Sequence, residues 1–154
     1  MQSSNILITF QLDELWLGMP IENVIRITRA VEITPQSEKP SYILGLINVA
    51  GEAVPVFDMR KMLALTSQVV RAKDYLILAR AGQRQFGLVV SRIEGTLAYA
   101  PNDIIELNDA AVGTKVKMIQ RQDRLIVVHD FQDIVDRFDQ EAPAHAPRAV
   151  ANVW

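Results

Sequence analysis

Two histidines are the residues of this sequence best suited to acid–base chemistry. His129 ends an apolar segment at a position where a related stretch earlier in the chain has Phe57, and His145 lies in an alanine- and proline-rich segment. Nucleophilic catalysis needs a base held beside the nucleophile and oriented by a third group. A position shared with phenylalanine indicates a packed ring. We therefore interpret His129 as a core residue and do not expect an enzyme.

The acidic residues and glycines give no ligand site by their spacing. The sequence has no cysteine, which excludes disulfides, thiolate nucleophiles and cysteine-based zinc sites. Asp13 with Glu14, and Asp103 with Glu106, are interpreted as turn and surface residues because they are not clustered as metal ligands are. The glycines are scattered and form no phosphate-binding loop. We expect no cofactor and no metal.

The basic residues do not predict nucleic-acid binding. The formal net charge is −2, so a broad basic surface for phosphates is not expected. Lys115 and Lys117 alternate along one predicted strand, and Arg121 and Arg124 follow, without the interleaved aromatic residues that stack on bases. We interpret these cations as a solvated strand edge.

The apolar segments are too short to predict membrane insertion. The run over 42–50 contains Asn48 and is far below the ~20 residues of a membrane span. Residues 1–5 lack the positive start of a signal peptide. We predict a cytoplasmic protein.

Most of the first 130 residues have the pattern of short strands. Runs of four to eight β-branched and apolar residues are bounded by Gly, Pro, Asn or Asp, which is typical of a sandwich or small barrel. The predicted strands cover residues 6–12, 15–21, 24–31, 44–49, 53–57, 75–80, 85–90, 95–98 and 125–129.

Two short helices and a tail complete the expected elements. Asp58 is placed to cap a helical turn, and Asp130 to cap a longer helix. One face of that longer helix carries four apolar residues: Phe131, Ile134, Val135 and Phe138. We interpret this face as core packing, with a partner-binding face as the alternative. Residues 140–154 are predicted to be a disordered tail, or alternatively a docking peptide that ends at Trp154.

Two segments recur in the same order along the chain. Residues 17–24 match 86–93, with a bulky apolar residue before glycine in each, and 54–63 match 126–135, with a strand that ends on aspartate. Two matches at nearly the same spacing indicate an internal duplication. We predict two small β-barrels with an apolar groove at their junction, where ligands bind preferentially.

The same motifs are similar to those of a known family. The most specific is Gly45-x-Ile47-Asn48-x-x-Gly51-x-x-Val54-Pro55-Val56-x-Asp58; it is accompanied by Leu17-Gly18-Met19-Pro20-Ile21-x-x-Val24 and Gly87-Leu88-Val89-Val90-x-x-Ile93. Together they resemble the CheW-like domain of bacterial chemosensory systems over about residues 5–138.

This resemblance implies a mainly β fold of two SH3-like five-stranded β-barrel subdomains, related by internal duplication and carrying short helices. The domain would span residues 5–139, with halves over 5–68 and 69–139 and a first strand that the halves can share. It implies a non-enzymatic adaptor that couples chemoreceptors to a CheA-type histidine kinase. The implied partners are the kinase regulatory domain, the cytoplasmic receptor tip and other CheW-like domains, at membrane receptor arrays.

The chain departs from the family pattern at two positions. The family usually has Asn-Leu-Arg-Gly where this chain has Ala50 before Gly51, and it often has Glu where this chain has Arg26. An alanine cannot replace the five donors of a guanidinium. One hypothesis is that Arg26 and Glu52 have exchanged polarity, which would keep a local ion pair and change partner choice. Neutral drift at a surface position is the alternative.

Eleven residues are predicted to bind partners near the groove. They are Val24, Arg26, Ile27, Asn48, Ala50, Gly51, Val54, Phe86, Gly87, Val89 and Ile93. For the apolar members, above all Val54 and Ile93, a core position is the alternative. The rival functions are a small-ligand module that uses Asn48 and Arg26, an interaction module that has lost kinase coupling, and an RNA-binding barrel. Net charge and the lack of stacking aromatics disfavour RNA.

Overall fold

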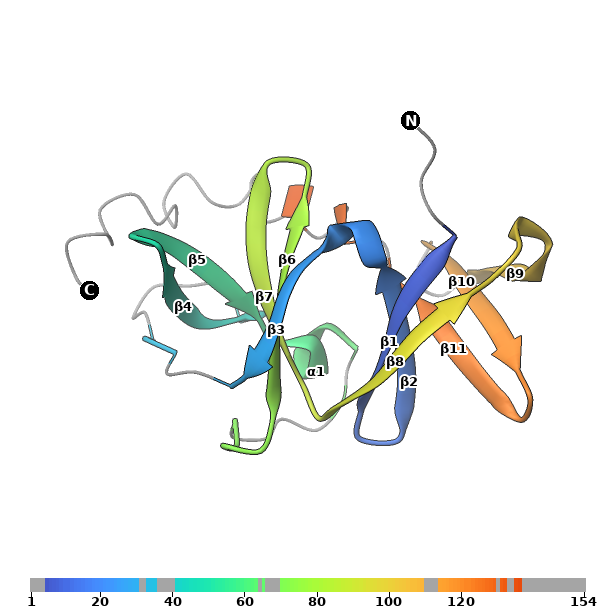
Figure 1. Ribbon diagram of the computed structural model, residues 1–154, viewed down its shortest axis with the longest axis horizontal. Helices are drawn as coiled ribbons and strands as arrows, with labels where there is room; N and C mark the ends of the chain where they lie inside the picture. The colour runs from blue at the N-terminus through green and yellow to red at the C-terminus, as the bar shows by residue number, and fades with distance from the viewer. Residues whose placement is uncertain are drawn as a thin grey trace. The chain divides into compact units, whose positions relative to one another are not determined.

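The computed structural model describes residues 5–30, 33–35, 41–63, 65, 70–109, 114–129, 131, 132, 135 and 136. Within these ranges the chain forms eleven strands in two sheets, one α-helix and two 3-10 turns. It divides into two compact units (Figure 1). Unit 1 contains Met1–Val24 and Ser91–Asp130, and unit 2 contains Ile25–Val90 and Phe131–Trp154. No helix of the described part is long and apolar enough to cross a bilayer.

Unit 1 is built on a six-stranded sheet in the order β8-β1-β2-β11-β10-β9. The one parallel pair joins β2 to β11, where Gly18 lies opposite Val128. The 3-10 turn η2 (Pro101–Asp103) leads from β8 into β9. The strands are β1 (Ile6–Leu12), β2 (Leu15–Pro20), β8 (Arg92–Ala98), β9 (Ile104–Asp109), β10 (Thr114–Arg121) and β11 (Arg124–Val128).

Unit 2 is built on a five-stranded sheet in the order β3-β6-β7-β5-β4. Its parallel pair joins β5 to β7, where Val56 lies opposite Gly87. The short turn η1 (Ile21–Asn23) precedes β3, and the helix α1 (Met59–Met62) follows β5. The strands are β3 (Val24–Arg29), β4 (Ile43–Val49), β5 (Glu52–Phe57), β6 (Tyr75–Ala81) and β7 (Arg84–Val90).

The two sheets confirm the predicted duplication. The order β8-β1-β2-β11-β10 in unit 1 repeats β3-β6-β7-β5-β4 in unit 2, and the parallel pairs have the same register, since Gly18 and Gly87 are equivalent. The sixth strand β9 corresponds in unit 2 to an isolated bridge between Thr34 and Leu46. Each sheet is open, because its first and last described strands are not paired with each other.

The expected division into residues 5–68 and 69–139 differs from these units. Each unit joins the first hairpin of one repeat to the later strands of the other: β1–β2 pairs with β8 and β11, and β6–β7 pairs with β5. The first hairpin of each repeat thus lies in the unit that holds the later strands of the other repeat. This arrangement results from the pairing of β2 with β11, two strands that are separated by more than half of the sequence.

The glycine that follows a bulky apolar residue in both repeats has a packing role. A Cβ on Gly87 would lie 3.1 Å from Cδ1 of Leu76 and 3.3 Å from Cγ2 of Val56, and a Cβ on Gly18 would lie 3.1 Å from Cδ1 of Leu7. Neighbouring strands therefore fill the space that a side chain would take. In unit 2 the face of the sheet next to Gly87 carries an apolar cluster: Ile47, Val54, Val56, Leu76 and Leu78.

Aromatic residues and the short helix α1 pack the rest of unit 2. The ring of Phe86 lies 5.5 Å from that of Phe57 and 5.4 Å from that of Phe131. Asp58 caps α1 as predicted, because its carboxylate accepts hydrogen bonds from the backbone N–H groups of Arg60 and Lys61. Phe131 and Val135 are buried, so the core interpretation of their helical face is confirmed for these two residues. Asp130, Ile134, Phe138, His145 and the predicted tail over 140–154 lie outside the described residues.

Candidate partner-binding surface

Three of the eleven predicted partner-binding residues belong to the core. Val54 is 2% exposed and Phe86 is 1% exposed, and Gly87 is buried between Leu76 and Val56. A partner cannot touch these side chains while the unit is folded. The prediction that these three residues lie at a surface is wrong, because all three pack inside unit 2.

Four further residues are only partly exposed. Val24 follows the turn η1, and Ile27 lies further along the same strand. Val89 packs against the apolar cluster of unit 2, and Ile93 lies opposite Phe10 in the β1–β8 pair. Each of these residues is half-buried, so its remaining surface could only add to a contact made mainly by its neighbours.

The exposed members are Arg26, Asn48, Ala50 and Gly51, all in unit 2. Three of them form the tip of the β4–β5 hairpin. Ala50 has φ 51° and Gly51 has φ 87°, which is the two-residue type I′ turn that suits a hairpin. The side-chain oxygen of Asn48 accepts a hydrogen bond of 2.8 Å from the Gly51 N–H. Asn48 therefore holds the turn, and Ala50 presents a small neutral tip.

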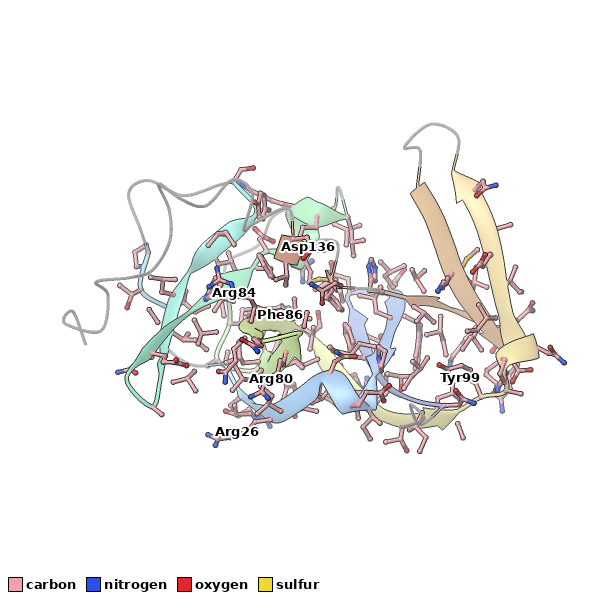
Figure 2. The ribbon with its side chains drawn as sticks, turned by 90° about the horizontal axis from the view of Figure 1, so that it is seen from above. Arg26, Arg80, Arg84, Phe86, Tyr99 and Asp136 are labelled. Atoms are coloured by element: carbon pink, nitrogen blue, oxygen red, sulfur yellow. The ribbon has the colours of Figure 1, made fainter. Side chains whose placement is uncertain are left out.

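Arg26 lies on the edge strand β3, and its side chain extends outward, whereas Phe86 lies within the unit (Figure 2). The strand is held by the neighbouring Arg29, whose guanidinium lies 4.4 Å above the Tyr75 ring and donates to the Lys73 carbonyl. The contacts of Arg29 therefore hold β3 in place, whereas Arg26 is exposed. Ile25, beside it, is 42% exposed.

The hypothesis of an ion pair between Arg26 and Glu52 is wrong. Arg26 lies on β3 and Glu52 begins β5, with β6 and β7 between them in the sheet. Three strand spacings amount to about 14 Å, far beyond ion-pair range. The same order places Arg26 and Asn48 on opposite edge strands, and the Asn48 oxygen is engaged by its turn. These two residues therefore give no support to a ligand site of their own.

An apolar surface that sequence reasoning missed lies on unit 1. Ile105 is 41% exposed, Leu107 is 51% exposed and Leu125 is 48% exposed; with Ile25 they are the large exposed hydrophobic residues of the described chain. Their partners across β10 are every second residue of that strand, so all three share one face. We call this set the β9–β11 face. The signal in the sequence is the alternation of Ile105 and Leu107 with Glu106 and Asn108.

His129 lies just after β11, where its N–H donates to the Gly18 carbonyl at 3.0 Å. Burial lowers the pKa of its imidazole below the ordinary value of 6.5. A largely buried imidazole at the position equivalent to Phe57 fits the packed-ring interpretation. Among the described residues no three His, Cys, Asp or Glu side chains gather as metal ligands would.

Comparison with known proteins gives the same family over most of the chain. The model of the CheW-like domain matches residues 7–139. The chemotaxis protein CheW of Thermotoga maritima is 28% identical over 132 residues, which are 84% of this chain and 86% of that protein. Protein FrzA of Myxococcus xanthus is 30% identical over 96 residues, 62% of this chain and 60% of that protein.

A solved structure has the same fold. The crystal structure of the scaffolding protein TtCheW from Thermoanaerobacter tengcongensis superposes with a TM-score of 0.73, over 84% of this chain and 92% of that chain. Its sequence identity is 23%, so this likeness concerns the fold alone.

Proposed function

Because the chain belongs to the CheW-like domain family, we propose that it is a non-enzymatic scaffold that couples chemoreceptors to a CheA-type histidine kinase. The supporting observation is the family match over residues 7–139, which spans both units. Relatives named as chemotaxis proteins CheW support the chemosensory setting. The protein would act in the cytoplasm and be recruited to membrane receptor arrays, since the receptor tips that it would bind lie there.

The surface chemistry supports a protein that joins two partners. Unit 1 carries the apolar β9–β11 face, and such exposed apolar patches mark protein–protein contacts. Unit 2 carries the exposed Ile25 and Arg26 on β3 and the hairpin tip at Ala50. We propose one partner contact on each unit, with the kinase regulatory domain and the receptor tip as the two partners. Other CheW-like domains are further candidates for either contact.

The test measures binding to each partner separately. The regulatory domain of a CheA-type kinase and a cytoplasmic receptor fragment from the same genome are titrated with the full chain by calorimetry. Leu107→Ser probes unit 1, and Arg26→Glu probes unit 2. Exposed turn residues supply the matched controls, Asn102→Ala in unit 1 and Gln83→Ala in unit 2.

Each surface variant is expected to weaken one partner by at least about tenfold, and each control to leave both affinities unchanged. A folded wild-type chain that binds neither partner would contradict the proposal. The alternative function, an interaction module that has lost kinase coupling, is favoured by the missing arginine at Ala50. It would be supported if the receptor fragment bound and the kinase domain bound only to Ala50→Arg.

A further inference from the structure

The inward faces of the two units differ although their strands are equivalent. The inward face of unit 2 is defined as the face of its sheet that carries the apolar cluster. The inward face of unit 1 is the equivalent face of the other sheet. In unit 2 this face has Leu78 on β6, and the equivalent residue of unit 1 is Thr9 on β1. Unit 2 has Val49 and Glu52 beside the β4–β5 turn, where unit 1 has Arg121 and Arg124. At this end of the face, unit 1 therefore has a threonine and two arginines where unit 2 has a leucine, a valine and a glutamate.

A cleft of about 350 Å³ occupies this place. It is lined by five consecutive strands and the β10–β11 turn. The lining residues are Thr9, Trp16, Glu94, Thr96, Leu97, Arg121, Gln122, Arg124 and Ile126, all in unit 1. The volume lies at the lower end of the range of roughly 300–1,000 Å³ for small-molecule sites.

Two of the three charged residues of the lining are already engaged by the protein. Arg121 lies 2.9 Å from a carboxylate oxygen of Asp103 and donates to the Ala98 carbonyl, so it fastens β10 to the end of β8. Glu94 accepts a hydrogen bond from the Gln11 amide and lies 3.7 Å from the guanidinium of Arg92. These pairs fix the walls of the cleft and neutralise each other's charge.

Arg124 is the third charged residue, and it is held differently. Its guanidinium carbon lies 4.3 Å from the centre of the Trp16 ring. Stacking occupies the flat face of a guanidinium and leaves the N–H donors in its plane available for a carboxylate or phosphate. Among the ion pairs between described residues, Arg124 has no carboxylate partner. Trp16 therefore positions the guanidinium of Arg124 in the lining of the cleft.

We propose that this cleft of unit 1 binds a small organic oxyanion, a carboxylate or phosphate group attached to a flat apolar body. Arg124 binds the oxyanion through paired N–H donors. Ile126 and Leu97 contact the apolar body, and the hydroxyl of Thr96, which also lines the cleft, offers a further donor. One unbalanced positive charge in the lining fits a ligand with a single anionic group. The site lies within one unit and is independent of the proposed coupling role.

The test is a titration of the ¹⁵N-labelled full chain, followed at the indole N–H of Trp16. The other indole belongs to Trp154, and Trp154→Phe assigns the two signals. The probes are 2-naphthoate, phenyl phosphate, the neutral 2-naphthylmethanol, and acetate, which has charge without an apolar body. We expect saturable binding of naphthoate or phenyl phosphate, and at least about tenfold weaker binding of the neutral probe and of acetate. The tighter of the two aromatic anions identifies the oxyanion.

Two variants and one control make the assignment specific. Arg124→Gln should weaken binding at least about tenfold, and Glu52→Gln, the equivalent position of unit 2, should not change it. Thr9→Leu introduces the residue that unit 2 has at Leu78 and should block the cleft while Arg124 stays in place. A thermal melt of each variant establishes that it is folded. The proposal is overturned if no probe gives a saturable shift, if the neutral probe binds equally well, or if folded Thr9→Leu binds like wild type.

Discussion

Replacing Ala50 by glycine is expected to stabilise the protein, because the turn of the β4–β5 hairpin forces this residue into the left-handed region. Its φ is 51°, and the turn residue that follows, Gly51, has φ 87°. A residue with a Cβ is disfavoured there by roughly 1–2 kcal/mol. Glycine loses roughly 0.5–1 kcal/mol more than alanine through its greater freedom in the unfolded chain. Subtracting the central values of these ranges leaves a net gain in the free energy of unfolding of about 0.75 kcal/mol.

The assay is thermal and urea unfolding of the wild type and of Ala50→Gly. For a chain of this size the gain corresponds to a rise in melting temperature of about 1–4 °C. Ala53→Gly is the matched control, because Ala53 lies on β5 and is not among the residues with positive φ. The same change there should destabilise by about 0.5–1 kcal/mol. Gln122, the equivalent of Ala50 in unit 1, has φ 55°, so Gln122→Gly should stabilise as Ala50→Gly does.

The reasoning is refuted if Ala50→Gly is no more stable than wild type, or if it changes stability in the same direction as Ala53→Gly. The outcome also bears on function. Arginine and alanine both carry a Cβ, so Ala50→Arg should keep the stability of the wild type. Any change in partner binding by Ala50→Arg can then be assigned to the guanidinium that the family usually has at this place.

Three further changes test the packing around Gly87, the imidazole of His129 and the ion pair of Arg121 with Asp103. Gly87→Ala should lower the free energy of unfolding by about 1–3 kcal/mol in urea titrations, because the new Cβ would lie 3.1 Å from Leu76; an unchanged midpoint would contradict the packing role. Burial lowers the pKa of His129, so the stability that its neutral form provides is complete above pH 6.5, declines as the pH falls below this value and is lost below the folded-state pKa. His129→Phe should therefore lose less stability than wild type between about pH 7.5 and about pH 5, and equal losses would show that His129 is not the group responsible. Arg121→Gln should cost about 1 kcal/mol or less, since the pair with Asp103 is partly exposed, but it should speed amide exchange in β10, which hydrogen exchange measures.

The local residue pattern predicted most strands but not β9. The strand over residues 6–12 was predicted with the bounds of β1, and that over 24–31 begins with β3, which ends at Arg29. β9 was not among the predicted strands, and its Glu106 was interpreted only as a turn or surface residue, although Glu106 and Asn108 alternate with the apolar Ile105 and Leu107. Alternation of period two is the stronger indicator of a half-exposed strand.

Pairing between distant strands could not be derived from the sequence. The duplication predicted two related β units, but the exchange of the β1–β2 hairpin depends on its pairing with β8 and β11, far along the chain. The same limit explains the errors in the predicted site. Phe86 and Gly87 belong to the repeated segment 86–93, yet only the register of β7 against β5 and β6 shows that they are buried. The two strands that flank Ala50 were predicted over 44–49 and 53–57, and the structure joins them by the turn at Ala50 and Gly51.

The central claim is that this chain joins a kinase and a receptor, and the most direct test is whether it binds both at once. The full chain is mixed with the regulatory domain of a CheA-type kinase and a cytoplasmic receptor fragment, and complex masses are measured by light scattering after gel filtration. The account predicts a ternary complex that contains all three proteins and is lost in the Leu107→Ser, Arg26→Glu double variant. Two mutually exclusive binary complexes, or no complex with a folded chain, would contradict it.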